Sequence, residues 1–227
     1  MRVKREGWGR PLTKGDFYRA MLAYIFWHRP FPQVAGAEYE PTLLEFHQYL
    51  ARAFSPGCWG SAVYRTGPAP WLGGQGGYED WYFVDAAWAL DPLNRAAVSG
   101  EVEPRHSAIA ALMETAHGGL YSLLWGDQVP APRSAVAWLT RPRGIRYETV
   151  LEEVRQRLPG PLTFWRRQML LGPAPEFALI GPPSLEPVLP SGWQAVVVER
   201  TCLWPAPDRA LVLGSPGERK PGGNVTD

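Results

Sequence analysis

The pattern of apolar residues near the start of the chain predicts a buried strand followed by a helix. Residues 20–27 form a short apolar and aromatic run that ends at His28-Arg29-Pro30, which is typical of a strand covered on both faces. Apolar residues then recur at three- and four-residue spacing, as on one face of a helix with Pro41 in its first turn. These helical positions are Leu43, Phe46, Leu50 and Phe54.

Three further strands and a second helix are predicted before residue 128. Apolar, β-branched and aromatic residues favour strands at 58–65, 78–84 and 120–125. Between the last two strands, residues 103–116 have helical spacing, and Gly118-Gly119 follows as a stop signal. The element order of the first half is therefore β-α-β-β-α-β.

The second half repeats this order with one element missing. Only a short segment with flanking prolines, residues 182–190, stands where the second helix is expected. The predicted elements are a strand at 135–139, a helix at 147–158, and strands at 162–170, 176–180 and 193–200. The second half is therefore expected to be a degenerate version of the first.

Comparison of the chain with itself supports a duplication. Residues 39–50 align without a gap on residues 147–158, with six identities in twelve positions. The tetrapeptide Gly-Pro-Ala-Pro occurs at 67–70 and again at 172–175. A self-match with such a long period indicates a repeated structural unit.

These observations define the expected fold class and domains. The order β-α-β-β-α-β is that of the ferredoxin-like unit, an α+β arrangement in which an antiparallel sheet carries its helices on one face. We expect two such units in tandem, with their sheets packed against each other. The expected segments are a basic arm (1–16), the first repeat (17–128), a Pro-rich linker (129–132), the degenerate second repeat (133–213) and a disordered tail (214–227).

In element order and duplication, the chain resembles the dimeric α/β-barrel superfamily, whose members pair two ferredoxin-like sheets between subunits or within one chain. The resemblance covers residues 17–205 and rests on no diagnostic motif. Members include cofactor-free monooxygenases, isomerases, decarboxylases, haem enzymes such as chlorite dismutases, and regulatory ligand-binding domains. The resemblance therefore implies a small-molecule site, and the chemistry has to be argued from its residues.

Composition and charge narrow the classes of partner. Lys plus Arg (23) nearly cancels Asp plus Glu (22), so no net field favours nucleic-acid binding. The early apolar run is far shorter than the roughly 20 residues of a membrane helix, so no membrane partner is expected. The two cysteines lack metal or disulfide spacing, which favours a cytoplasmic location. Assembly as a homo-oligomer stays open.

All four histidines lie in the first half, which favours that half as the location of any chemistry. His28 ends the first strand, where it is either an acid or base at a pocket mouth or an exposed loop residue. His47 is interpreted as a residue on the flank of the helix, because arginine takes its place in the second half. His106 and His117 are about 16 Å apart along the predicted second helix and cannot share a metal, so no metal site is predicted.

The strand before residue 85 carries the candidate carboxylates. By alternation, Tyr78 and Asp80 face one side of this strand, and Glu79 and Trp81 face the other. A buried carboxylate here needs a partner, because an unpaired buried charge is costly. The candidate partners are Arg65, Arg29 and His28. An ion pair of Asp80 or Glu79 with Arg65 either belongs to a site or is purely structural.

A Gly-rich segment, residues 71–77, precedes that strand and is shortened in the second half. It lacks the Gly-Lys-Ser/Thr and the following helix of a phosphate-binding loop. We interpret the segment as a lid with Trp71 at its tip; the alternative is an ordinary hairpin loop.

The resulting hypothesis is binding of a small, partly apolar organic molecule in the first half, by a protein that acts as a cofactor-independent monooxygenase- or isomerase-like enzyme. The candidate catalytic residues are His28, Tyr78 and Asp80. The candidate substrate-binding residues are Trp27, Arg65, Trp71, Glu79 and Trp81. The alternative is a non-catalytic module for ligand sensing or protein interaction.

Haem is not expected as a cofactor. In the haem enzymes of the superfamily, the proximal histidine belongs to the C-terminal repeat, and the second half of this chain has no histidine. A haem iron here would therefore need a different axial ligand.

Overall fold

The computed structural model describes residues 21–54, 56–126, 131–157, 162–169 and 171–204. The predicted arm (1–16) and tail (214–227) lie outside these residues, as does part of the predicted linker. The domain boundaries given above therefore stay predictions.

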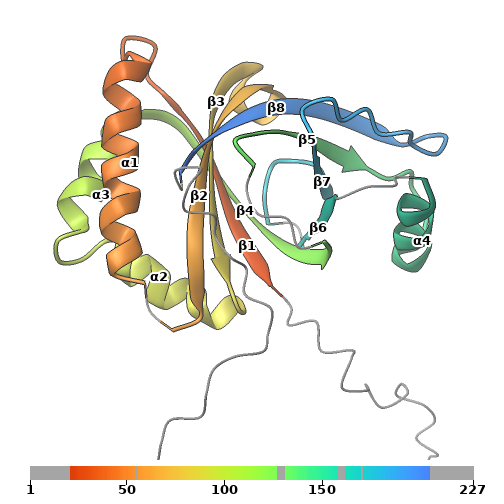
Figure 1. Cartoon of the computed structure of the whole chain (residues 1–227), viewed down its shortest axis with the longest axis horizontal. Coiled ribbons are helices and arrows are strands. Elements are labelled where there is room, and N and C mark those ends of the chain that lie inside the picture. Colours follow the sequence, from red (N-terminus) through yellow and green to blue (C-terminus); the bar gives the residue numbers. More distant parts are fainter. Residues whose placement is uncertain (1–20, 55, 127–130, 158–161, 170, 205–227) are drawn as a thin grey trace, which may run out of the picture.

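Eight antiparallel strands close into a single barrel at the centre of the molecule (Figure 1). Around the barrel their order is β1-β3-β2-β8-β5-β7-β6-β4. The strands are β1 (Leu22–Pro30), β2 (Cys58–Ala69), β3 (Gln75–Val84), β4 (Met113–Trp125), β5 (Arg133–Thr140), β6 (Thr163–Arg167), β7 (Phe177–Gly181) and β8 (Gln194–Trp204).

Each half of the chain contributes four adjacent strands to the barrel. The N-terminal strands follow the order β4-β1-β3-β2, and the C-terminal strands follow the order β8-β5-β7-β6. In both halves, the spatial order is therefore the fourth, first, third and second strand of that half. Pairing of β2 with β8 and of β4 with β6 joins the halves. The predicted α+β class and the packing of the two sheets into one barrel are confirmed.

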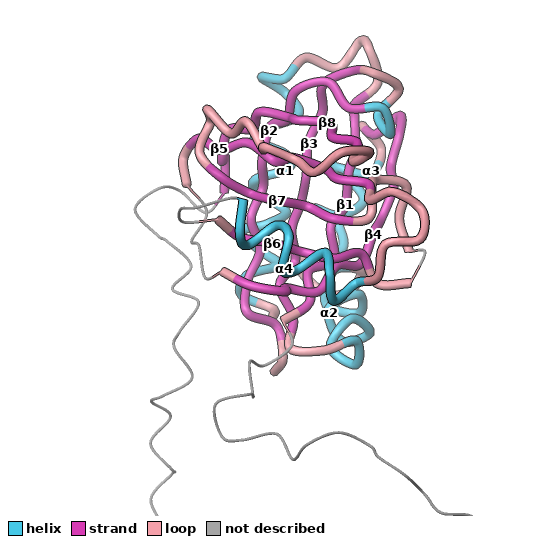
Figure 2. The backbone as a smooth tube through the Cα atoms, turned by 90° about the vertical axis from the view of Figure 1, so that its right-hand side faces the viewer, coloured by secondary structure: helices cyan, strands magenta, loops and turns pink. Residues whose placement is uncertain are grey.

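Four α-helices lie outside the barrel in the described part of the chain: α1 (Gly36–Arg52), α2 (Leu90–Ala97), α3 (Glu103–Ala110) and α4 (Tyr147–Arg157). Helices α1 to α3 cover one side of the barrel, and α4 lies on the opposite side (Figure 1). The side view places α4 in front of the strands (Figure 2). Among the described residues, no helix has the length and apolar character needed to cross a membrane.

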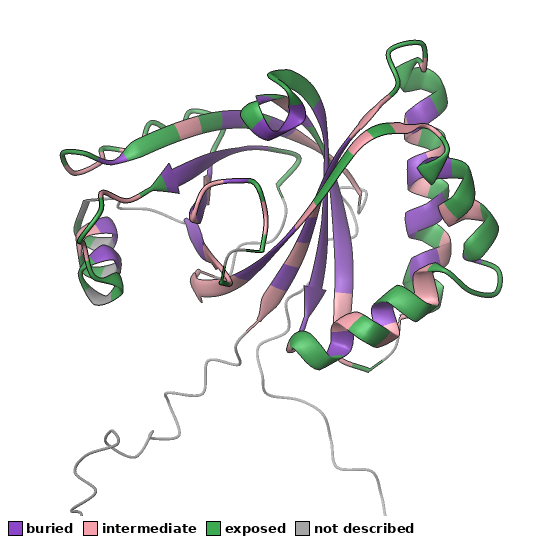
Figure 3. Cartoon of the chain, turned by 180° about the vertical axis from the view of Figure 1, so that it is seen from behind, coloured by how far each residue is buried: buried purple, intermediate pink, exposed green. Residues whose placement is uncertain are grey.

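Alternation along the strands creates an interior core and an outer one. Inward-facing rings fill the barrel, among them Trp27, Trp81 and Trp138, which are all nearly inaccessible to solvent. Outward-facing side chains of the first half pack beneath α1 to α3, whose buried residues face the strands while their outer faces are exposed (Figure 3). The site described below lies in this outer layer.

Between β7 and β8, where the second helix of a full repeat would lie, the described residues form no helix, as predicted. Residues 182–190 form turns and extended chain instead. The outer face of β8 consequently stays partly uncovered, and Val197 is 46% exposed.

Three local predictions were wrong. Pro41 lies inside α1 and not in its first turn. The helix predicted at 103–116 ends at Ala110, because the following residues pair with β1 from Met113 onward, and α2 precedes it as an unpredicted helix. Long-range strand pairing has here overridden local helical spacing.

Candidate functional site

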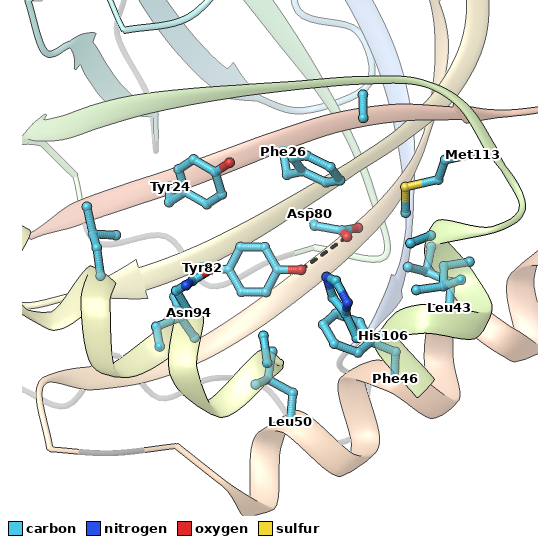
Figure 4. Close-up of a pocket in the computed structure, with 16 residues that line it drawn as sticks. Tyr24, Phe26, Leu43, Phe46, Leu50, Asp80, Tyr82, Asn94, His106 and Met113 are labelled. Carbon is cyan, nitrogen blue, oxygen red and sulfur yellow. Dashed lines mark hydrogen bonds between the residues drawn. The ribbon is translucent and has the colours of Figure 1, made fainter. Parts of the chain in front are cut away.

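A cavity of about 530 Å³ lies between the outer face of β1, β3 and β4 and the helices α1 to α3 (Figure 4). Its walls are mostly apolar with a few polar groups, as is typical of sites for small organic molecules. The lining residues are Tyr24, Phe26, Leu43, Phe46, Leu50, Asp80, Tyr82, Leu90, Leu93, Asn94, Ala97, His106, Ile109, Ala110, Met113 and Ala116.

A buried carboxylate between two imidazoles forms the polar part of the sheet-side wall. Asp80 of β3 has its Oδ1 atom 3.1 Å from Nε2 of His28 and its Oδ2 atom 3.3 Å from Nε2 of His47. All three residues are at most 1% exposed. Tyr82 donates a hydrogen bond of 3.3 Å from its hydroxyl to Oδ2 of the same carboxylate.

The outer nitrogens of the two imidazoles contact hydroxyl groups. Nδ1 of His28 lies 2.5 Å from the Tyr39 hydroxyl, and Nδ1 of His47 lies 2.9 Å from Oγ of Ser61. Each ring thus turns Nε2 toward Asp80 and Nδ1 toward a hydroxyl group, which can donate or accept a hydrogen bond.

Electrostatics keep Asp80 ionised. Burial by itself raises the pKa of this carboxyl, but the facing His28 and His47 outweigh it and lower the pKa below its ordinary value. The Tyr82 hydroxyl responds in the opposite direction, because burial and the Asp80 charge both raise its pKa well above the ordinary value. The cluster is thus an ionised carboxylate that accepts a hydrogen bond from Tyr82 and faces two imidazoles.

Periodicity in three elements builds this cluster. Alternation along β3 turns Asp80 and Tyr82 toward the helices, on the face opposite Glu79; the opposite faces were predicted, and the structure assigns the helix side to Asp80. The strand register places Phe26 of β1 beside Asp80, so that His28 is two residues further along the same outward face. On α1, His47 follows Leu43 by one turn and therefore faces the sheet.

The interpretation of His47 as a flank residue is consequently wrong. The side chain is 0% exposed and contacts Asp80, whose position in the sequence is remote from the helix. Its position among the apolar residues of α1 was a signal of burial. Its partner was not visible in the sequence, since the contact depends on how α1 lies across β3.

Two other polar groups reach the cavity from the helices. His106 of α3 lies edge-on to Phe46 with their ring centroids 5.8 Å apart, and Asn94 comes from α2. Figure 4 shows both side chains on the helix side, across from Asp80. Neither residue was among the predicted site residues. The predicted placement of His106 and His117 on one helix is wrong, because His117 belongs to β4.

Tyr78 and Arg65, two of the predicted site residues, lie beside the cluster and outside the cavity lining. The Tyr78 ring stacks on His28 with centroids 5.6 Å apart, and its hydroxyl donates to Glu40 at 3.1 Å. Arg65 donates to both carboxylate oxygens of Glu40, at 2.6 and 2.8 Å. The hypothesis that Arg65 pairs with Asp80 or Glu79 is therefore wrong.

Glu79 and its tryptophan neighbours belong to the barrel interior. Trp27 and Trp81 each donate an indole hydrogen bond to Glu79, at 3.3 and 3.2 Å. Arg200 of β8 provides the ion-pair partner at 3.3 Å. Burial raises the pKa of Glu79, while Arg200 and the donors lower it, with a net rise. This network faces away from the cavity and connects the two halves of the barrel.

The structure also places Trp71 in the barrel interior. The ring is 9% exposed and meets Trp27 and Trp138 edge-on, with centroids 6.0 and 5.3 Å away. The Gly-rich segment is mostly regular, because a short 3-10 turn (Pro70–Leu72) leads through Gly73 and Gly74 into β3. A lid over a pocket of the first half is therefore not formed, and the lid interpretation is wrong.

The outer layer of the second half contains no comparable cluster among its described residues. In the first half, His28 of β1 pairs with Tyr78 of β3. At the corresponding place in the second half, Leu139 of β5 pairs with Phe177 of β7. Leu179, two residues further along β7, is buried among apolar side chains beneath α4. The polar cluster is thus particular to the first half of the chain.

Comparison with known proteins extends the fold-level picture. No family model matches the sequence, and no curated protein matches it. Two solved structures are similar in fold. One is a candidate chlorite dismutase, with a TM-score of 0.53 and 9% sequence identity, and the match covers 81% of this chain and 95% of the other. The second is a candidate monooxygenase from Fusobacterium nucleatum, with a TM-score of 0.54 and 7% sequence identity, and the match covers 82% of this chain and 94% of the other. The chain therefore shares its fold with these two structures.

Haem, which the resemblance implies for some members of the superfamily, finds few groups to hold it in this cavity, where His106 is the one histidine of the lining. His28 and His47 use both ring nitrogens for contacts with Asp80 and with hydroxyl groups. The cavity lining contains no Lys or Arg to meet the carboxylates of a haem. In the described part of the chain, no group of three His, Cys, Asp or Glu side chains has the geometry of a metal site.

Proposed function

We propose that this protein binds a small, partly apolar organic molecule in the cavity beneath α1 to α3. The observation that carries the proposal is an ionised, fully buried Asp80 at the wall of a cavity that is otherwise mostly apolar. Such a wall gives a bound molecule a hydrophobic environment together with one strong polar contact that fixes its orientation.

The reaction class that this site supports best is a cofactor-independent conversion, either monooxygenation with O₂ as co-reactant or isomerisation. Both classes can begin with removal of a proton from the bound molecule. Asp80 is a weak base because its pKa is lowered, so its proposed role, with His28 behind it, is to hold the molecule. Imidazole suits proton exchange near neutral pH, and we assign that role to His106 in the opposite wall.

Ligand sensing without catalysis is the second candidate function. The lowered pKa of Asp80 makes this carboxylate a better binding partner than proton acceptor. A protein-interaction module in which Trp71 forms an exposed contact surface is not proposed, because the Trp71 ring is buried.

Two further proposals concern the whole chain. We propose that the halves are copies of one ferredoxin-like unit, since their strands occupy corresponding places in the barrel. We also propose a cytoplasmic location, on the grounds of composition and cysteine usage.

Cavity-blocking variants test the proposed binding site. The neutral aromatic alcohol 2-naphthylmethanol serves as the probe, and its affinity is measured by isothermal titration calorimetry. Ala110 lines the cavity from α3, whereas Ala108 is exposed on the same helix and does not. Ala110→Phe should weaken binding at least about tenfold by filling the cavity, and Ala108→Phe should leave it unchanged. Equal affinities in both variants would show that the probe does not bind in this cavity.

Native mass spectrometry of the purified protein then searches for the natural occupant. A retained small molecule that is lost in Ala110→Phe and kept in Ala108→Phe is the expected result. Incubating the isolated molecule with the protein and O₂ separates the two candidate functions. Turnover that falls in His106→Gln supports the enzyme, and binding without turnover supports the sensor.

A further inference from the structure

The charge of the cavity lining restricts the kind of molecule that it accepts. Among the sixteen lining residues, Asp80 is the single carboxylate, and there is no Lys or Arg. An anion placed in this cavity would be repelled by Asp80 through a medium of low dielectric constant, where charges interact far more strongly than in water. A cation would be attracted to Asp80 for the same reason.

Among the described residues, no Lys or Arg pairs with Asp80. The groups that face its carboxylate are the imidazoles of His28 and His47 and the hydroxyl of Tyr82. A buried anion without a cation is costly, and natural proteins usually pair it. Glu79, on the opposite face of the same strand, does have such a partner in Arg200.

The carboxylate retains capacity to accept another hydrogen bond. Oδ1 of Asp80 lies 3.1 Å from Nε2 of His28, but the two atoms are not aligned for a hydrogen bond. A carboxylate offers about four lone-pair directions, and the aligned donor recorded for Asp80 is Tyr82 on Oδ2. Asp80 belongs to the cavity lining, so its carboxylate is the charged acceptor that a ligand N–H meets there.

Aromatic rings surround the same carboxylate. Tyr24 lies between Phe26 and Tyr82, with ring centroids 6.4 and 6.1 Å away, and Phe46 comes from α1. Figure 4 shows the rings of Tyr24, Phe26 and Tyr82 around Asp80 on the sheet side of the cavity. Ring faces attract cations within about 6 Å, and this attraction strengthens when water is excluded. Aromatic walls and a carboxylate both select for organic cations.

We propose that the ligand of this cavity is an apolar or aromatic amine, bound as its ammonium ion with an N–H directed at Asp80. This inference rests on the proposed function, because it concerns the same cavity, and it adds the charge class of the ligand. The ammonium group gives Asp80 the positively charged partner that no Lys or Arg of the lining provides, and the apolar body fills the space between the sheet and α1 to α3.

Three probes that share one ring system test the charge preference: 2-naphthylmethylamine (cationic), 2-naphthylmethanol (neutral) and 2-naphthoate (anionic). Their affinities for the full-length protein are measured by calorimetry at neutral pH. We expect the amine to bind at least about tenfold more tightly than the naphthoate, with the alcohol between them. Binding of the naphthoate as tight as that of the amine would overturn the proposal. If none of the three probes bound, both the amine proposal and the proposed binding function would be contradicted.

Variants trace the preference to its source. Asp80→Asn should abolish the difference between amine and naphthoate. Asp91→Asn is the matched control, because Asp91 lies on α2 next to the cavity, is exposed and pairs with Arg95 at 2.9 Å. This control should keep the full difference. A preference that persists in Asp80→Asn, or disappears in Asp91→Asn, would contradict the assignment to Asp80.

A charge-adding variant covers the case in which Asp80→Asn does not fold. Asn94 lines the cavity and is exposed, so Asn94→Asp adds a carboxylate at the wall without burying it fully. The amine should then bind several-fold more tightly and the naphthoate more weakly than in the wild-type protein. The opposite change would overturn the proposal.

Discussion

At the scale of single residues, Asp80 combines a structural and a functional role. Its carboxylate holds together β1, β3 and α1 through His28, Tyr82 and His47. Removing the charge while keeping the shape should therefore affect both folding and ligand binding. The sign of the pH dependence separates the ionic contribution from simple packing.

We expect Asp80→Asn to lower the free energy of unfolding by about 2 to 3 kcal/mol at neutral pH, as for loss of hydrogen bonds to a charged group. Because the folded pKa of Asp80 is lowered, its stabilisation is present above the unfolded value of about 3.9 and is lost as pH falls through the folded value. The difference between wild type and variant should thus shrink in acid. Urea unfolding at several pH values measures it, with Asp91→Asn as control; a constant difference would contradict an ionic origin.

Trp71 is predicted to stabilise the barrel and not to bind ligand. Trp71→Ala should cost about 3 to 5 kcal/mol, as for other buried tryptophans, because it opens a hole beside Trp27 and Trp138. The affinity of folded protein for 2-naphthylmethanol should not change. Trp88→Ala is the control, since Trp88 is 58% exposed and should cost much less. Chemical unfolding and calorimetry on both variants check the prediction.

At the scale of elements, a close approach between β1 and β4 shapes one wall of the cavity. Gly118 of β4 lies opposite Phe26 and so close to Tyr24 that a Cβ atom would stand 2.3 Å from the Tyr24 hydroxyl. Glycine is required here because the tyrosine ring crosses the neighbouring strand. The position of Tyr24 in the cavity therefore depends on a residue that does not line it.

Gly118→Ala should displace Tyr24, at a cost of about 1 to 3 kcal/mol for overpacking, and should weaken binding of 2-naphthylmethanol. The two effects should disappear in a Tyr24→Ala background, where nothing opposes the new methyl group. A double-mutant cycle of unfolding free energies gives the coupling directly. Additive costs would show that Gly118 acts through another neighbour.

At the scale of the whole molecule, the closed barrel makes the two halves mutually dependent. Trp81 and Tyr64 of the first half and Trp138 and Trp165 of the second share one interior, and Arg200 meets Glu79 across it. Each half alone would expose this apolar face to water. The hydrophobic effect therefore favours the halves only together.

We expect separately expressed halves, residues 17–128 and 133–213, to be insoluble alone and to associate when coexpressed. Copurification through a tag on one half, followed by the circular dichroism of the pair, measures this. Two soluble monomeric halves with cooperative unfolding would contradict the dependence.

The buried tyrosines predict how the protein behaves in alkali. Burial is the largest cause of a raised pKa in six tyrosines: Tyr24, Tyr39, Tyr64, Tyr78, Tyr82 and Tyr121. The pKa of Tyr78 rises to about 12. A raised folded pKa means that stability is complete below the unfolded value of about 10 and is lost as pH rises toward the folded value.

Near pH 10, the phenolate absorbance should therefore report fewer ionised tyrosines in the native protein than in the unfolded chain. In the unfolded chain, all nine tyrosines titrate. The missing phenolates should form together with loss of the near-ultraviolet circular dichroism. Titration of all nine tyrosines without loss of structure would contradict the burial that causes the shifts.

The sequence by itself determined the features that depend on local periodicity. Alternation assigned the faces of Asp80 and Glu79, helical spacing located α1, and the order of elements gave the fold class. Tertiary structure decided which side chains the two carboxylates contact. His47 reaches Asp80 only because α1 packs on β3. Arg200, which pairs with Glu79, is 121 residues away from it in the sequence. Local patterns show that a side chain is buried, whereas the register and packing of distant segments determine which side chain it contacts.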